Sequence, residues 1–148
     1  MIYGIIFTAV IAIDQFTKYL IRANLNLGER ISIIGDWFNI TYVQNTGTAF
    51  SMFSGNRFVT VVLTTILIGL CLVVLIKEAR SGSRALALCL AAVMSGGVAN
   101  MIDRLSLGFV TDMLSFGSFA VFNVADIAVT CGCFAAMLVV ILDYRNQK

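Results

Sequence analysis

The sequence predicts a membrane-embedded, all-α protein in which four transmembrane helices carry a small extramembrane β-sheet between helices 1 and 2. Of its 148 residues, 59% are hydrophobic and only 12% are charged, and the mean hydropathy is +0.95. Soluble domains are about half apolar and roughly a quarter charged, so this chain has too few charges to solvate a globular surface. The apolar residues also gather in runs that are long enough to cross a bilayer.

The hydrophobic runs divide one membrane domain into four expected spans, at about residues 1–21, 58–76, 85–102 and 124–142. Residues 58–76 contain no charged side chain. As a helix they would measure about 28 Å, which is close to the hydrocarbon thickness of a bilayer. The first run begins without Lys or Arg and continues past its own charges. We therefore expect a retained span rather than a cleaved signal peptide.

The segment at about residues 24–56 has a different character from the spans. Residues 31–34 and 37–44 are typical of two short strands around the turn Gly35–Asp36. A smaller extramembrane piece follows the third span and contains another expected strand at residues 109–114.

The distribution of Lys and Arg predicts the orientation of the chain. The short loop between the second and third spans and the C-terminal tail are denser in Lys and Arg than the longer segments on the other side. By the positive-inside rule, that loop and both termini lie in the cytoplasm.

The composition excludes several classes of site. Histidine is absent, so Ser-His-Asp and Cys-His nucleophiles and imidazole-based zinc sites are excluded. The 4 cysteines lie in apolar stretches, where thiols act as small hydrophobic groups. No basic run with interleaved aromatic residues suggests nucleic acid. We expect no metal, no cofactor and no nucleic-acid partner.

The polar side chains of the spans and their connections fall on one leaflet once the spans alternate in direction. These residues are Asp14, Lys18, Asn100, Asp103, Arg104, Asp112, Asn123 and Asp126. Because an ionisable group is costly inside a membrane, each is a candidate for function. Asp14 and Lys18 are four residues apart, and Asn123 and Asp126 are three apart, so each pair shares a helix face.

Several of these residues also fit a structural role. Asp14 and Lys18 could neutralise each other so that the first span can insert, and Asp103 with Arg104 is typical of an ion pair at a helix end. Asn100 is typical of a hydrogen bond between helices. For these residues the structural interpretation is the favoured one.

Asp112 and Asp126 are the carboxylates that lack an obvious partner in the sequence. Two aspartates at close range in a low-dielectric site cannot both ionise easily, so they share a proton. One can then accept a proton from water while the other donates to the substrate. This acid–base pair requires no histidine, metal or cofactor.

Three alternatives stay open at this point. A proton- or ion-coupled protein would use Asp14, Lys18 and Asp126 as a relay, although the charge-poor inner halves of the spans argue against it. A Ser-Lys protease would use Lys18 as the base and Ser51 or Ser95 as the nucleophile. A helical subunit that only assembles with partners would tolerate the loss of either unpaired aspartate.

Short motifs along the chain resemble those of the lipoprotein signal peptidases (signal peptidase II) over nearly its whole length. The matching segments are Asp14-Gln15-Phe16-Thr17-Lys18, Asn45-Thr46-Gly47-Thr48-Ala49-Phe50-Ser51, Asn100-Met101-Ile102-Asp103-Arg104, Val110-Thr111-Asp112 and Phe122-Asn123-Val124-Ala125-Asp126. Each segment alone is a weak signal, but their order and the spans between them make the resemblance specific.

The resemblance implies a multi-pass aspartic endopeptidase of the bacterial inner (cytoplasmic) membrane, with its active site near the periplasmic face. It would cleave signal peptides from diacylglyceryl-modified prolipoproteins, N-terminal to the lipidated cysteine, with water activated by aspartate. The catalytic aspartates of the family fall on Asp112 and Asp126. Expected partners are the lipid-modified precursor and membrane lipid, and a monomer is expected.

Other positions that match the family motifs are expected to bind substrate or shape the site. They are Asp14, Lys18, Asn45, Gly47, Gly96, Asn100, Arg104, Asn123 and Ala125. Residues 24–56 match the small periplasmic sheet, or cradle, of the family. The chain departs from the family pattern at Ala99 and Met113 and in a shorter, proline-free loop between the two aspartates. We expect these differences to affect the substrate entrance rather than the reaction.

Overall fold

A computed structural model describes residues 1–47, 57–81, 83–117 and 121–146. Its helices are α1 (Ile2–Asn24), α2 (Arg57–Ser81), α3 (Arg84–Ser106) and α4 (Val124–Asn146). All 4 are long and apolar enough to cross a membrane. This confirms the predicted fold class of four transmembrane helices with a small sheet.

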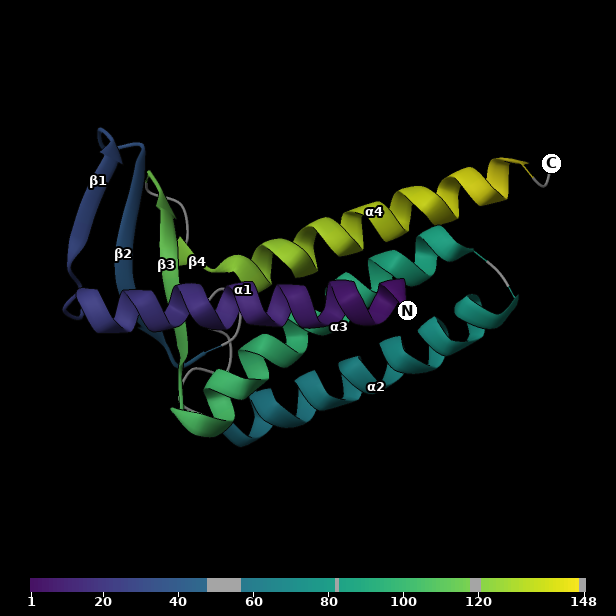
Figure 1. The fold of residues 1–148 in the computed structure, drawn as a ribbon, viewed down its shortest axis with the longest axis horizontal. Coiled ribbons are helices and arrows are strands. Elements are labelled where there is room, and N and C mark those ends of the chain that lie inside the picture. Colours follow the sequence, from purple (N-terminus) through teal and green to yellow (C-terminus); the bar gives the residue numbers. More distant parts are fainter. Residues whose placement is uncertain (48–56, 82, 118–120, 147–148) are drawn as a thin grey trace.

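Helix α3 lies at the centre of the bundle and packs against the three other helices (Figure 1). Small residues permit this close packing. A Cβ atom on Gly96 would collide with the carbonyl oxygen of Ala125 in α4 and lie 2.7 Å from Val129 Cγ2. Farther along α4, a Cβ atom on Gly132 would lie 2.8 Å from Val93 Cγ2. The backbones of α3 and α4 therefore approach each other at glycine on both helices.

The described strands form one four-stranded antiparallel sheet, which lies at one end of the helices (Figure 1). Its strands, in spatial order, are β1 (Arg30–Ile34), β2 (Phe38–Asn45), β3 (Val110–Phe116) and β4 (Val121–Phe122). The first two come from the predicted segment between α1 and α2. The other two come from the connection between α3 and α4, so the sheet joins two parts of the chain that are far apart in sequence.

A small apolar cluster attaches the sheet to the end of α1. Tyr42 of β2 and Met113 of β3 are buried against Ile21 of α1, and Ile40 and Leu114 pack around them. Because β2 and β3 pair in antiparallel register, Val43 and Asn45 lie opposite Asp112 and Val110. The sheet thus holds the end of β2 beside the carboxylate of β3.

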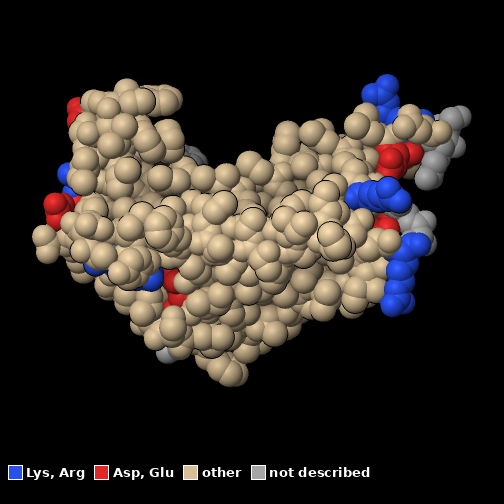
Figure 2. Space-filling view, in the orientation of Figure 1, with Lys and Arg blue, Asp and Glu red and all other residues tan. Residues whose placement is uncertain are grey.

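The charged residues on the surface are consistent with a chain that crosses a bilayer. On the face shown in Figure 2, Lys, Arg, Asp and Glu gather toward the two ends of the molecule, with a wide uncharged surface between them. The start of α1 and the end of α4 both lie at the end opposite to the sheet (Figure 1). A lipid-facing helix surface is expected to be uncharged over this length.

Candidate active site

Asp112 lies in β3, where the sheet meets the helices, and its side chain is only 2% exposed. Its two oxygens accept hydrogen bonds from two asparagines. Asn45 Nδ2 lies 2.9 Å from Oδ2, and Asn123 Nδ2 lies 2.6 Å from Oδ1. These bonds come from the end of β2 and the start of α4, so the carboxyl group is fixed from both sides.

Asp126 occupies the first turn of α4, where local helix chemistry positions it. Asn123 directly precedes the helix, and its Oδ1 accepts from the Asp126 backbone N–H at 2.9 Å. In return, Asp126 Oδ2 accepts from the Asn123 backbone N–H at 3.2 Å. This is the reciprocal arrangement of a capping box, made here with Asn and Asp. Oδ1 of Asp126 also accepts from Asn100 Nδ2 of α3, at 2.8 Å.

Asn123 connects the two aspartates. Its side-chain amide donates to Asp112 and, at 3.1 Å, to Asn100 Oδ1, while its backbone N–H donates to Asp126. Asn123 is fully buried, so this connection is shielded from water. The two carboxylates are therefore neighbours that share one hydrogen-bonding residue.

The environment of Asp112 favours its protonated form. The pKa of this carboxyl is raised to about 6, from an ordinary value of 3.8, and burial is the largest cause. The Asp126 charge also contributes to this rise, whereas the bonds from Asn45 and Asn123 and the Lys18 charge oppose it. Asp112 can therefore hold a proton at a pH where an exposed aspartate has lost it.

Arg104 contacts the segment after β2 rather than its neighbour in sequence. Its Nη2 donates to the Gly47 carbonyl oxygen at 3.2 Å, and the Gly47 backbone N–H donates to Asn45 Oδ1 at 3.0 Å. The interpretation of Asp103 and Arg104 as an ion pair is wrong. Consecutive helical residues do not face each other, and Asp103, 1% exposed, faces Lys18 instead.

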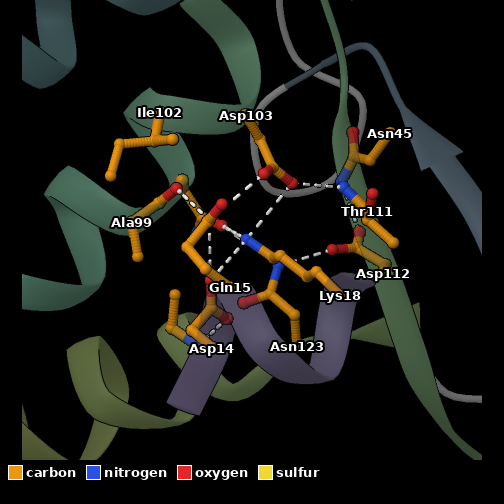
Figure 3. A network of polar contacts seen from close by, with 12 residues as sticks. Asp14, Gln15, Lys18, Asn45, Ala99, Ile102, Asp103, Thr111, Asp112 and Asn123 are labelled. Atoms are coloured by element: carbon orange, nitrogen blue, oxygen red, sulfur yellow. Dashed lines mark hydrogen bonds and ion pairs between the residues drawn. The ribbon is translucent and has the colours of Figure 1, made fainter. Parts of the chain in front are cut away.

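Lys18 forms a buried ionic cluster with Asp14 and Asp103 (Figure 3). Its Nζ is 2.8 Å from Asp14 Oδ2, 3.4 Å from Asp103 Oδ2 and 2.8 Å from Asn100 Oδ1. The predicted pairing of Asp14 with Lys18 is therefore present. An ammonium group has three N–H donors, and these three partners use all of them.

All the predicted site residues lie in one connected region. Besides the contacts above, the Ala125 backbone N–H donates to Asp14 Oδ1 at 2.8 Å, and Gly96 packs directly against the Ala125 carbonyl. Residues 48–51 of the second motif lie outside the described residues.

The family described as signal peptidase II matches residues 6–142. The chain belongs to the signal peptidase II family. Membership makes it a peptidase, and with its four helices it is a bacterial membrane protein.

Relatives of the family match the chain over nearly its full length. The lipoprotein signal peptidase of Brevibacillus brevis is 39% identical over 150 residues and covers 100% of both chains. That of Shouchella clausii is 39% identical over 140 residues, covering 94% of this chain and 92% of the relative. That of Streptococcus thermophilus is 41% identical over 133 residues, covering 88% and 86%.

The fold is also shared with a solved structure. A bacterial membrane enzyme determined at 2.3 Å resolution is 25% identical, with a TM-score of 0.88, covering 99% of this chain and 91% of the other. A bundle of four helices with a sheet at one end is thus also found in a solved membrane enzyme.

The serine–lysine alternative finds no support in this member of the signal peptidase II family. Ser95 is fully buried and donates to the Ala92 carbonyl of its own helix at 2.7 Å. Lys18 Nζ is engaged by two carboxylates and an amide, and none of these partners is Ser95. Ser51 lies outside the described residues.

Sequence reasoning missed three residues of this region. Gln15, Arg22 and Thr111 all contact the ionic cluster. Arg22 could have been found, because it lies four residues after Lys18 on the same helix face. The bond from Thr111 to Asp103 could not be predicted, since a backbone N–H makes it.

Replacing Gly96 by alanine tests whether the α3–α4 contact places the start of α4. The new Cβ would meet the Ala125 backbone, which no rotamer change can relieve, so α4 must shift together with Asp126. We expect kcat to fall about 100-fold, because displacements of about 1 Å have this effect.

Gly69→Ala in α2 is the matched control, because a Cβ there would have nothing within 4 Å. Thermal unfolding in detergent and cleavage kinetics measure both variants. Equal activity of the two variants would show that the α3–α4 contact does not position the site.

Proposed function

We propose that this chain is a membrane-embedded aspartic endopeptidase that removes signal peptides from diacylglyceryl-modified prolipoproteins, cutting N-terminal to the lipidated cysteine. Family membership and the relatives named lipoprotein signal peptidase support the substrate class. The observation that carries the mechanism is the shared contact of Asp112 and Asp126 with Asn123. It brings together two carboxylates of different environment, as acid–base catalysis requires.

The different environments suggest the role of each aspartate. Asp112 is almost fully buried and has a raised pKa, so it is the proton donor. Asp126 is only partly buried, accepts two N–H groups and lies within the electrostatic influence of Arg104. Asp126 therefore takes the role of the base.

The proposed reaction has two steps. Asp126 removes a proton from water as the water oxygen bonds to the scissile carbonyl carbon, and Asp112 gives its proton to the carbonyl oxygen. The resulting gem-diol then returns a proton to Asp112 while Asp126 protonates the leaving nitrogen and the C–N bond breaks. Both aspartates end in their starting protonation states, so the cycle balances.

Neighbouring residues hold this arrangement. Asn45 and Asn123 orient the Asp112 carboxyl, and Asn100 orients Asp126. Arg104 holds the Gly47 carbonyl and so keeps the end of β2 at the site. Backbone amides of a substrate strand need hydrogen-bond partners where water is scarce, and the partly buried Asn45 at the end of β2 is placed to provide one.

The proposed topology follows from the charges and the arrangement of the helices. The start of α1, the end of α2, the start of α3 and the end of α4 lie opposite to the sheet (Figure 1), and the sequence on this side is denser in Lys and Arg. We therefore place the termini in the cytoplasm and the aspartates near the periplasmic face of the inner membrane. The enzyme acts as a monomer in contact with membrane lipid.

Cleavage of a defined precursor tests this function. Purified protein in lipid nanodiscs is incubated with a synthetic precursor that carries diacylglyceryl-cysteine, and with the same peptide bearing an unmodified cysteine. Mass spectrometry should find one cut, directly before the lipidated cysteine, and the rate should be unchanged by EDTA. Cleavage at another bond, or equal cleavage of both peptides, would contradict the proposed specificity. Inhibition by EDTA would contradict the aspartate mechanism.

A further inference from the structure

The residue directly before each of the two aspartates is held by its backbone N–H. Thr111, before Asp112, donates its N–H to Asp103 Oδ2 at 2.9 Å. Ala125, before Asp126, donates its N–H to Asp14 Oδ1 at 2.8 Å. Each acceptor is a buried carboxylate, 0–1% exposed. We call these two contacts the backbone clamps.

The clamp on Thr111 takes the place of a neighbouring strand. Strand β4 pairs only with Leu114 and Ser115 of β3, so it does not reach Thr111. A buried N–H without a partner costs free energy, and the Asp103 carboxylate satisfies it. Arg22 adds a second contact, because its Nη1 donates to Thr111 Oγ1 at 3.0 Å and lies 3.8 Å from Asp103.

One lysine joins the two clamps. The Lys18 ammonium lies 2.8 Å from Asp14 Oδ2 and 3.4 Å from Asp103 Oδ2. Figure 3 shows Lys18 between these two carboxylates, with Thr111 bonded to Asp103. Gln15 spans the same carboxylates, since its Nε2 lies 3.4 Å from Asp14 Oδ2 and 3.2 Å from Asp103 Oδ1.

We propose that Asp14, Lys18 and Asp103 are positioning residues that set the separation between Asp112 and Asp126 by holding the backbones of Thr111 and Ala125. This inference rests on the proposed function. The Lys18 ammonium attracts both carboxylates. Helix α1 therefore fixes the distance between β3 and the start of α4.

Charge balance alone does not require this arrangement. A buried ion pair costs desolvation, and apolar residues of similar volume often stabilise a protein as well or better. An ion pair within α1 would also let the helix insert without touching Thr111 or Ala125. What the cluster adds is two backbone contacts, each one residue from a carboxylate of the proposed reaction. Displacements of about 1 Å at reacting groups cost about 100-fold in rate.

Four variants separate positioning from charge balance. The cluster contains two carboxylates, Asp14 and Asp103, and two cations, Lys18 and Arg22. Asp103→Asn and Lys18→Met each leave one unbalanced charge, whereas the double variant restores the balance without restoring the bridge. Asp103→Glu keeps every charge but moves the carboxylate by one methylene group.

The measurements are kcat, KM and the unfolding temperature in nanodiscs, with the lipidated precursor as substrate. We expect the double variant and Asp103→Glu to unfold near the wild-type temperature, yet to lose about 30-fold or more in kcat, with KM within about twofold, because the reacting groups are displaced. Asp36→Glu, at the exposed turn between β1 and β2, is the control and should keep wild-type kinetics.

If kcat recovers together with the unfolding temperature in the double variant, the cluster only balances charge and the proposal is overturned. Wild-type kcat in Asp103→Glu would overturn it as well. Asp112→Asn, measured in parallel, separates this inference from the proposed function. If that variant is inactive while the cluster variants keep full kcat, only the clamps are wrong. If Asp112→Asn cleaves normally, both ideas fail.

Discussion

Replacing either aspartate by asparagine is expected to remove about 10³-fold or more of the cleavage rate, because each variant loses a proton donor or acceptor that acts in the transition state. Asparagine has nearly the same shape as aspartate, so Asp112→Asn and Asp126→Asn change the chemistry with little change in packing. The measurement is single-turnover cleavage of the lipidated precursor in nanodiscs. Asp36→Asn, an exposed carboxylate on the same sheet, should cleave at the wild-type rate.

The stability of Asp112→Asn separates chemistry from folding. The folded state raises the pKa of Asp112 to about 6, so the ionised carboxylate becomes unfavourable in the folded protein as pH rises through this value. The neutral asparagine avoids that loss. Its amide nitrogen cannot accept one of the two N–H groups that Asp112 accepts, so at pH 8 these opposing effects should leave the variant folded, with an unfolding temperature near that of the wild type. A variant that is inactive only because it is unfolded would not support the aspartate mechanism.

Replacing Asn123 is the second change with a large expected effect, about 100-fold in kcat, because this residue orients both carboxylates. Two substitutions divide its roles. Serine can still accept the Asp126 backbone N–H as a helix cap, but it cannot reach Asp112 with an amide. Alanine removes both contacts.

We expect Asn123→Ser to unfold near the wild-type temperature and Asn123→Ala to lose about 1 kcal/mol through the missing cap, while both lose activity to a similar extent. Asn24→Ala, at the exposed end of α1, is the matched control. Full activity in the serine variant would mean that the amide bridge to Asp112 has no role in the reaction.

The helices could be predicted from sequence because hydropathy and length report membrane spans directly. The strands β1 and β2 follow from a local pattern around a turn. The joining of β3 to β2 could not be predicted, because Asn45 and Val110 pair across a long stretch of chain and no local signal encodes the register. This long-range pairing is what brings Asn45 to Asp112.

The site was predictable where motifs and helix spacing coincide. Asp14 and Lys18 share a helix face and do pair, and Asn123 and Asp126 form the reciprocal cap that their spacing allows. Asp103 was misinterpreted because adjacency in sequence was taken as contact, although neighbouring helical residues diverge. Its main partner is a backbone N–H, which sequence patterns do not reveal.

The most direct measurement of the central idea, one proton held between two coupled aspartates, is a pH titration by difference infrared spectroscopy. In the wild type, a protonated carboxyl band assigned to Asp112 should disappear as pH rises through about 6, and the cleavage rate should fall over the same range. Because the Asp126 charge raises the pKa of Asp112, Asp126→Asn should shift that midpoint to lower pH. An unshifted midpoint in Asp126→Asn, or no such band in the wild type, would contradict the paired-aspartate mechanism.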